Sequence, residues 1–88
     1  MDISGSRLDE IEQRFDVVVA NIVHDILLAL ADDLSRLVMP GGTLVLSGLI
    51  HGEQTESIGR CFLERDFCLV EQAREKEWGA LRLEKKEG

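Results

Sequence analysis

The chain has 88 residues, of which 44% are hydrophobic and 31% are charged, and its formal net charge is −7. This length allows one small domain at most, and the hydrophobic content is that of a folding sequence. The negative charge argues against nucleic-acid binding through a basic patch, and is compatible with a basic protein partner or a solvated acidic surface. No apolar run is long enough to span a membrane and no signal peptide is recognisable, so we expect a cytoplasmic protein.

Cysteine and histidine spacing gives no metal-binding motif. Cys61 and Cys68 form no CxxC pair, and His24 and His51 lie far apart without HExxH spacing. We therefore expect no metal site and two reduced, structural cysteines.

The first strong structural signal is a continuous apolar strand. Residues 1–14 are predicted to be a polar lead-in, with a turn at residues 4–6 and one short helical turn through Leu8 and Ile11. Residues 15–20 then contain three consecutive valines, which is typical of a strand covered on both faces, as in a parallel sheet. Asn21 follows at the carboxyl end of this strand, which is where open α/β sheets bind their ligands.

An amphipathic helix is predicted next. Asp25 is the expected N-cap. Pro40 and the Gly41-Gly42 pair are expected to end the helix and turn the chain. Apolar residues recur between them at steps of three and four, namely Ile26, Leu27, Leu30, Leu34, Leu37 and Val38.

The remaining pattern predicts a strand, a helix and a hairpin. Residues 43–47 form a second apolar strand that Gly48 closes, and residues 53–65 form a second helix. Residues 67–73 and 78–83 are predicted strands joined by a charged turn, and the short connection makes them antiparallel.

The resulting order is β-α-β-α-β-β, which indicates an α/β sheet with right-handed crossovers. If both crossovers step the same way, both helices cover one face of the sheet. The two apolar strands carry side chains toward both faces, however, so the second face and the outer edge of the first strand are expected to be uncovered. We therefore predict that residues 1–88 are a single partial domain, and that it forms a homodimer or pairs with a complementing chain through that edge or face.

Four segments resemble a known family in order and spacing: Phe15–Ile22, Leu37–Gly42, Leu46–Ile50 and Glu77-Trp78. The family is the PrmA-type methyltransferases, which modify protein L-eleven of the large ribosomal subunit. The Pro-Gly-Gly turn is common to many class I methyltransferases. Ala-Asn-Ile combined with Leu-Ser-Gly-Leu and the late Glu-Trp is much more specific, and the resemblance extends over residues 3–83.

The resemblance implies a partial Rossmann-like sheet, equivalent to strands four to seven of a seven-stranded domain that binds S-adenosylmethionine. The family's glycine-rich cofactor loop and the acidic residue after its second strand have no counterpart in this sequence. We therefore expect S-adenosylmethionine to be the implied methyl donor and the chain alone to be inactive. The alternative is a non-enzymatic half-domain that self-associates or complements a separate amino-terminal half.

The resemblance places Asn21 beside both the methyl donor and the target amine, and Ile22 in the same cleft. A carboxamide suits amine methylation because its oxygen accepts a hydrogen bond without stabilising the unreactive ammonium. Ser47 and Gly48 are candidate walls of the substrate cleft. The alternative for Asn21 is that it only caps the strand end, and the alternative for Ser47-Gly48 is that it only forms a tight turn. Trp78 is expected to pack in the core or at its rim.

Overall fold

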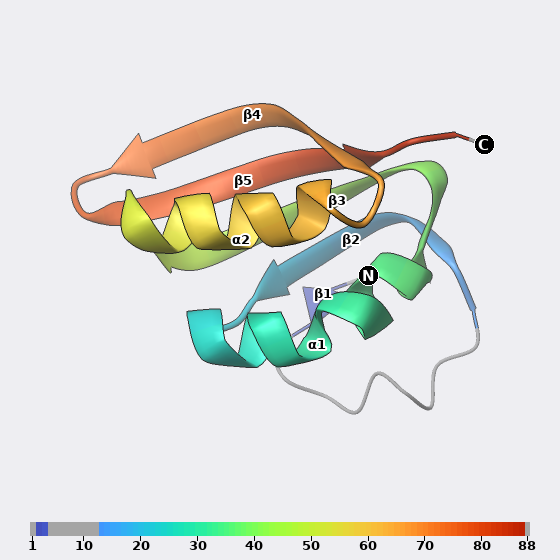
Figure 1. Cartoon of the computed structure of the whole chain (residues 1–88), viewed down its shortest axis with the longest axis horizontal. Helices are drawn as coiled ribbons and strands as arrows, with labels where there is room; N and C mark the ends of the chain where they lie inside the picture. Colours follow the sequence, from blue (N-terminus) through green and yellow to red (C-terminus); the bar gives the residue numbers. More distant parts are fainter. Residues whose placement is uncertain (1, 4–12, 88) are drawn as a thin grey trace.

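The computed structural model describes residues 2–3 and 13–87, which form one mixed sheet with two helices (Figure 1). The elements are β1 (Asp2–Ile3), β2 (Phe15–Asn21), α1 (His24–Leu37), β3 (Val38–Ile50), α2 (Glu53–Leu63), β4 (Phe67–Glu75) and β5 (Trp78–Lys85). The sheet order in the described residues is β1-β2-β3-β5-β4. β1, β2 and β3 run parallel, whereas β5 is antiparallel to both β3 and β4. The predicted α/β class and the carboxyl-terminal hairpin are confirmed.

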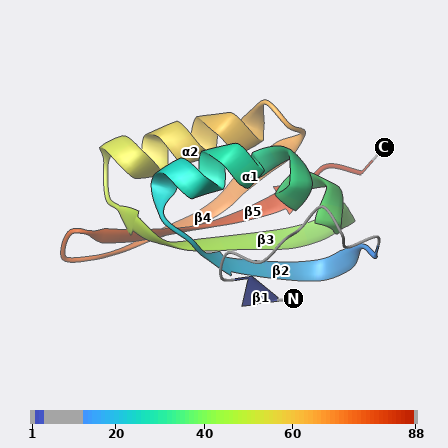
Figure 2. The ribbon, with the colours of Figure 1, turned by 90° about the horizontal axis from the view of Figure 1, so that it is seen from below.

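Both helices lie on the same face of the sheet, as Figure 2 shows. The core sits between these two layers. Leu27, Leu34 and Leu37 of α1 and Ile58 and Phe62 of α2 are fully buried there. The strands present alternate residues to the helices because successive side chains point to opposite faces. The buried apolar strand residues are Val18, Ala20, Val38, Leu44, Leu46, Leu49, Phe67, Leu81 and Leu83.

The opposite face of the sheet carries no helix in the described part of the chain, and we call it the open face. In β2 and β3 it presents Val19 and Val45, which are partners in the strand register, and Thr43, which lies two residues before Val45. These side chains are only partly buried. Farther along the face, Arg82 of β5 pairs with Glu71 of β4 at 3.8 Å. The open face is thus apolar over β2–β3 and charged over β5–β4.

Four sequence predictions need correction. The lead-in is not wholly irregular, because Asp2–Ile3 forms β1 and pairs with Val19 and Ala20. The outer edge of β2 is therefore partly occupied by the chain's own residues. The turn and helical turn predicted within residues 4–12 lie outside the described residues. The first helix begins at His24, so Val23 and not Asp25 takes the N-cap position, without a side-chain cap.

The other two corrections concern turns. β3 starts directly after α1, at Val38, and the Pro-Gly-Gly segment forms an irregularity within it: Phe15 pairs with Val38 whereas Val17 pairs with Thr43. Proline has no N–H for a sheet ladder, so the segment bulges from the strand. The hairpin turn is also shorter than predicted, because β4 runs to Glu75.

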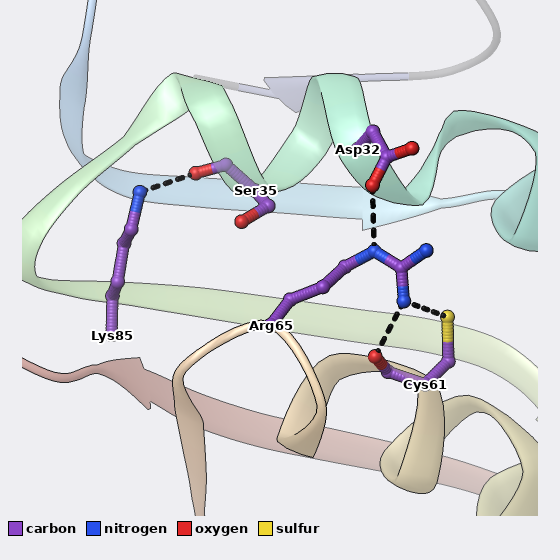
Figure 3. Close-up of polar contacts among 5 residues, drawn as sticks. All are labelled: Asp32, Ser35, Cys61, Arg65 and Lys85. Atoms are coloured by element: carbon purple, nitrogen blue, oxygen red, sulfur yellow. Dashed lines mark hydrogen bonds and ion pairs between the residues drawn. The ribbon is translucent and has the colours of Figure 1, made fainter.

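At the amino end of the parallel strands, Arg65 joins the two helices and Lys85 joins β5 to the end of α1 (Figure 3). Arg65 donates from Nε to Asp32 of α1 at 2.8 Å and from Nη1 to the Cys61 carbonyl of α2 at 2.8 Å. The hydrogen bond with Asp32 raises the pKa of Arg65. Lys85 donates to the carbonyls of Ser35 and Val38, at 2.8 and 3.0 Å, and so satisfies the end of α1. Burial is the main cause that lowers the pKa of Lys85. These contacts hold both helices at the end of the sheet away from Asn21.

Candidate functional site

The carboxyl edge of the two parallel strands brings three of the predicted site residues together. Asn21 is the last residue of β2, and it pairs in register with Ser47 of β3. Gly48 follows Ser47 directly, at a shift in the β3–β5 register between Leu46 and Leu49. The β2 pairing therefore explains why residues far apart in sequence meet at one edge.

Gly48 lies directly against the Asn21 side chain. Its φ is +79°, a conformation that residues with a Cβ rarely adopt. A Cβ built on Gly48 would also overlap Asn21 Oδ1. A tight turn explains the positive φ of Gly48, but it does not explain why a Cβ at this position would overlap Asn21. Glycine at this position therefore leaves space for the Asn21 carboxamide, and Asn21 is exposed to solvent there.

Ile22, the second residue predicted to hold the methyl donor, is 6% exposed and belongs to the hydrophobic core. Its side chain packs beneath the edge and contributes little surface to a cleft. A contact with a ligand would therefore depend chiefly on its backbone.

A cavity of about 290 Å³ opens beside Ser47 and Gly48, and we call it the hairpin pocket. It is lined by Ser47, Gly48, residues 73–75 and residues 78–80. Ser47 and Gly48 thus form one wall of a concave site, as the cleft hypothesis requires. The opposite wall comes from the β4–β5 hairpin and includes Trp78, which is 51% exposed and so lies at a rim. Sequence reasoning missed this wall.

A second cavity of about 290 Å³ lies at the start of both helices, lined by His24, Ile50, Glu53, Gln54 and Ser57. The His24 ring contacts Ser57 Oγ at 3.0 Å through Nε2 and Asp25 Oδ1 at 3.0 Å through Nδ1. The contact with Ser57 joins α1 to α2, whereas the contact with Asp25 lies within α1. The described contacts therefore give His24 a structural role and place no base next to Asn21.

Among the described residues, no group of three or more His, Cys, Asp or Glu side chains is positioned to hold a metal ion. In the same part of the chain, neither helix has the length and hydrophobicity that crossing a membrane requires.

Known proteins resemble this chain in sequence and in fold. The family model for ribosomal protein L11 methyltransferase (PrmA) matches residues 3–86. This chain belongs to the PrmA family. A ribosomal protein L11 methyltransferase of Desulfotalea psychrophila is 41% identical over 86 residues, which are 98% of this chain and 29% of that protein. A Streptococcus pyogenes relative with the same description is 41% identical over 78 residues, or 89% of this chain and 24% of its own length.

Solved structures agree with the family assignment. The ribosomal protein L11 methylase of Lactobacillus delbrueckii subsp. bulgaricus superposes with a TM-score of 0.83 at 29% identity, over 93% of this chain and 42% of that one. A putative methyltransferase of Thermoplasma acidophilum has a TM-score of 0.72 at 14% identity, over 92% of this chain and 44% of that one, and shows likeness of fold alone. The PrmA-family chain described here spans less than a third of the curated relatives cited.

The Gly48–Asn21 contact leads to a stability prediction for this PrmA-family chain. Gly48→Ala is expected to lower the free energy of unfolding by about 1–2 kcal/mol because of the backbone conformation alone. The overlap of the new methyl group with Asn21 should add to this loss. In an Asn21→Ala background, only the backbone cost should remain. Urea unfolding of the wild type, both single variants and the double variant gives the coupling between the two sites. A coupling of zero would show that the Asn21 side chain does not depend on Gly48.

Proposed function

We propose that these residues form the carboxyl-terminal part of a methyltransferase domain that transfers a methyl group to an amine of ribosomal protein L11. The family supports the substrate class, since the relatives carry that description. The observation that carries the proposal is the exposed Asn21 carboxamide, held against Gly48 at the carboxyl edge of a parallel strand pair. A cytoplasmic location and the absence of direct nucleic-acid contact are part of the same proposal.

The described residues fit one side of a site for S-adenosylmethionine. Glycine at position 48 leaves room for the Asn21 carboxamide, and the buried Ile22 gives this edge a fixed base. Asn21 and the Ile22 backbone would hold the methyl donor, which supplies an electrophilic methyl carbon on a sulfonium. We infer that the rest of its pocket comes from residues outside this sequence, and that the chain alone is inactive.

The role of Asn21 in this proposal is to hold a neutral amine. Its Oδ1 accepts a hydrogen bond from the amine N–H, which leaves the nitrogen lone pair directed at the methyl carbon. When bound, S-adenosylmethionine would supply the methyl group, with its sulfonium sulfur as the leaving group. The product ammonium then releases a proton to water. A carboxylate in place of Asn21 would favour the charged, unreactive amine before the reaction.

A chimeric protein tests the proposal. It consists of the D. psychrophila relative with the matched segment replaced by this chain, which is 41% identical to it. The chimera is expected to transfer a labelled methyl group from S-adenosylmethionine to ribosomal protein L11, whereas the chain alone should bind the donor no tighter than millimolar in calorimetry. A folded chimera without methyl transfer would contradict the enzymatic proposal. Tighter binding by the chain alone would contradict its inferred inactivity.

The open face supports a second candidate function, a half-domain that pairs with a second copy or with a complementing chain. Both helices lie on the other face, and the apolar side chains of Val19 and Val45 face solvent without a helix over them. Covering that surface with another apolar surface would remove it from water. A second copy is available wherever the chain is expressed, so we infer a homodimer through this face.

Val45→Lys tests self-association. Multi-angle light scattering should give the wild-type chain a mass of two copies, because each copy covers the other's apolar strip. The variant should give the mass of one copy, because a lysine at the centre of the interface would lose its hydration. Leu63→Lys is the matched control, since Leu63 is 49% exposed and belongs to α2, which covers the opposite face of the sheet (Figure 2). A wild-type chain that runs as a folded monomer, or a dimer that Val45→Lys leaves intact, would contradict the homodimer.

A further inference from the structure

We propose that the hairpin pocket binds a second basic side chain of the protein substrate, one that is not methylated. The inference rests on the proposed function for its substrate class and extends it to a position that determines specificity. The residues that carry it are Glu75 and Trp78. In the sequence, Glu75 falls in the predicted charged turn between the last two strands, and Trp78 was expected to pack in the core or at its rim.

The hairpin pocket combines an apolar floor with the indole ring of Trp78 and the carboxylate of Glu75. Ala73 and Ala80 lie opposite each other across β4 and β5, on the open face. Glu75 and Trp78 are the next pair along that face, at the end of the hairpin, and Trp78 is 51% exposed. The methylene stem of a lysine or arginine packs on such a floor. The indole face and the carboxylate then both attract its charge.

Among the described residues, the neighbouring Arg74 is held by a hydrogen bond to a backbone carbonyl and not by an ion pair with Glu75. Arg74 also lines the pocket, but its Nε donates to the Lys76 carbonyl at 2.8 Å, which holds the guanidinium toward the hairpin turn. Glu75 forms no ion pair with any residue that the structure describes. The chain's net charge of −7 adds a long-range attraction for a basic partner.

The occupant differs from the reacting amine because the two positions favour opposite protonation states. A carboxylate stabilises an ammonium, which has no lone pair to attack a methyl carbon. Asn21 is uncharged and leaves the amine neutral. Ser47 and Gly48 separate the two positions, since they adjoin Asn21 on one side and line the hairpin pocket on the other. A substrate with two basic side chains close together can therefore occupy both.

Fluorescence titration of the full chain tests the proposal, because Trp78 is the chain's one tryptophan. The probe is capped trilysine, without S-adenosylmethionine, and capped trinorleucine is its uncharged counterpart. Trilysine should change the emission in a saturable and salt-sensitive way, and trinorleucine should not. Glu75→Gln should weaken trilysine binding about three- to fivefold, which is the range for an exposed ion pair. Glu77→Gln makes the same charge change on the turn outside the pocket, and should alter binding less than about twofold.

The outcomes separate this proposal from the enzymatic one. Equal weakening by Glu75→Gln and Glu77→Gln, or equal binding of the two peptides, would overturn the pocket assignment. Asn21→Ala should leave trilysine binding within about twofold, because that residue lies outside the pocket. If the chimera transfers no methyl group while Glu75→Gln still weakens trilysine binding selectively, the proposed function fails and the docking pocket stands.

Discussion

Phe62→Ala is expected to remove a large share of the stability of this chain. The Phe62 side chain is fully buried on the sheet side of α2, and its ring meets that of Phe67 edge to face at a centroid distance of 5.5 Å. Truncation loses the transfer free energy of the ring, the aromatic contact and the packing around the cavity left behind, together about 3–5 kcal/mol. Small domains have a total stability of roughly 5–15 kcal/mol. The variant should therefore be partly unfolded at 37 °C.

Urea unfolding followed by far-UV circular dichroism measures the loss. Leu63→Ala is the control, because Leu63 is the next residue of α2 and is 49% exposed. It should change the free energy of unfolding by less than about 1 kcal/mol. Similar losses for the two variants would mean that Phe62 does not pack between the helix and the sheet as described.

Local patterns predicted the elements that depend on local residues. The run of valines predicted β2 and the spacing of the leucines predicted α1, and the structure contains both elements, at Phe15–Asn21 and His24–Leu37. β1 gave no such signal, because a two-residue strand has no period and its pairing with Val19 and Ala20 is a long-range contact. The start of α1 was misplaced for a related reason. His24 is fixed by Ser57, which lies 33 residues away, and an N-cap rule cannot detect that partner.

The candidate site was predictable as an edge but not as a pocket. Parallel strands end together, so Asn21 and Ser47 were expected to meet, and the structure pairs them. The second wall depends on the register of the β4–β5 hairpin, which pairs Glu75 with Trp78. That register includes a shift between Leu69 and Glu71, and a shift of one residue moves a side chain to the other face of a sheet. No local pattern in β4 reveals such a shift, and glutamates on an edge strand resemble a solvated surface.

Asn21→Ala in the chimera is expected to lower kcat for methyl transfer by about 10²-fold. The variant loses the one hydrogen bond from this chain that would orient the amine, and alanine leaves a gap beside Gly48. Exposed residues at a strand end contribute little to stability, so the fold should persist. Single-turnover assays with labelled methyl donor measure the rate. Asp32→Asn is the control, because Asp32 lies on α1 at the opposite end of the sheet and contacts Arg65.

Asn21→Asp separates the proposed chemistry from simple strand capping. Aspartate has nearly the same shape and still accepts hydrogen bonds, so a purely structural role predicts a rate close to that of the wild type. In the proposed mechanism, the new carboxylate raises the pKa of the substrate amine, so a smaller fraction is neutral at pH 7 and the rate falls. Raising the pH deprotonates the amine, so the variant's rate should recover toward that of the unmodified chimera, whose own profile should level off at lower pH. Parallel pH–rate profiles for the two proteins would refute the assignment of Asn21 as the group that holds a neutral amine.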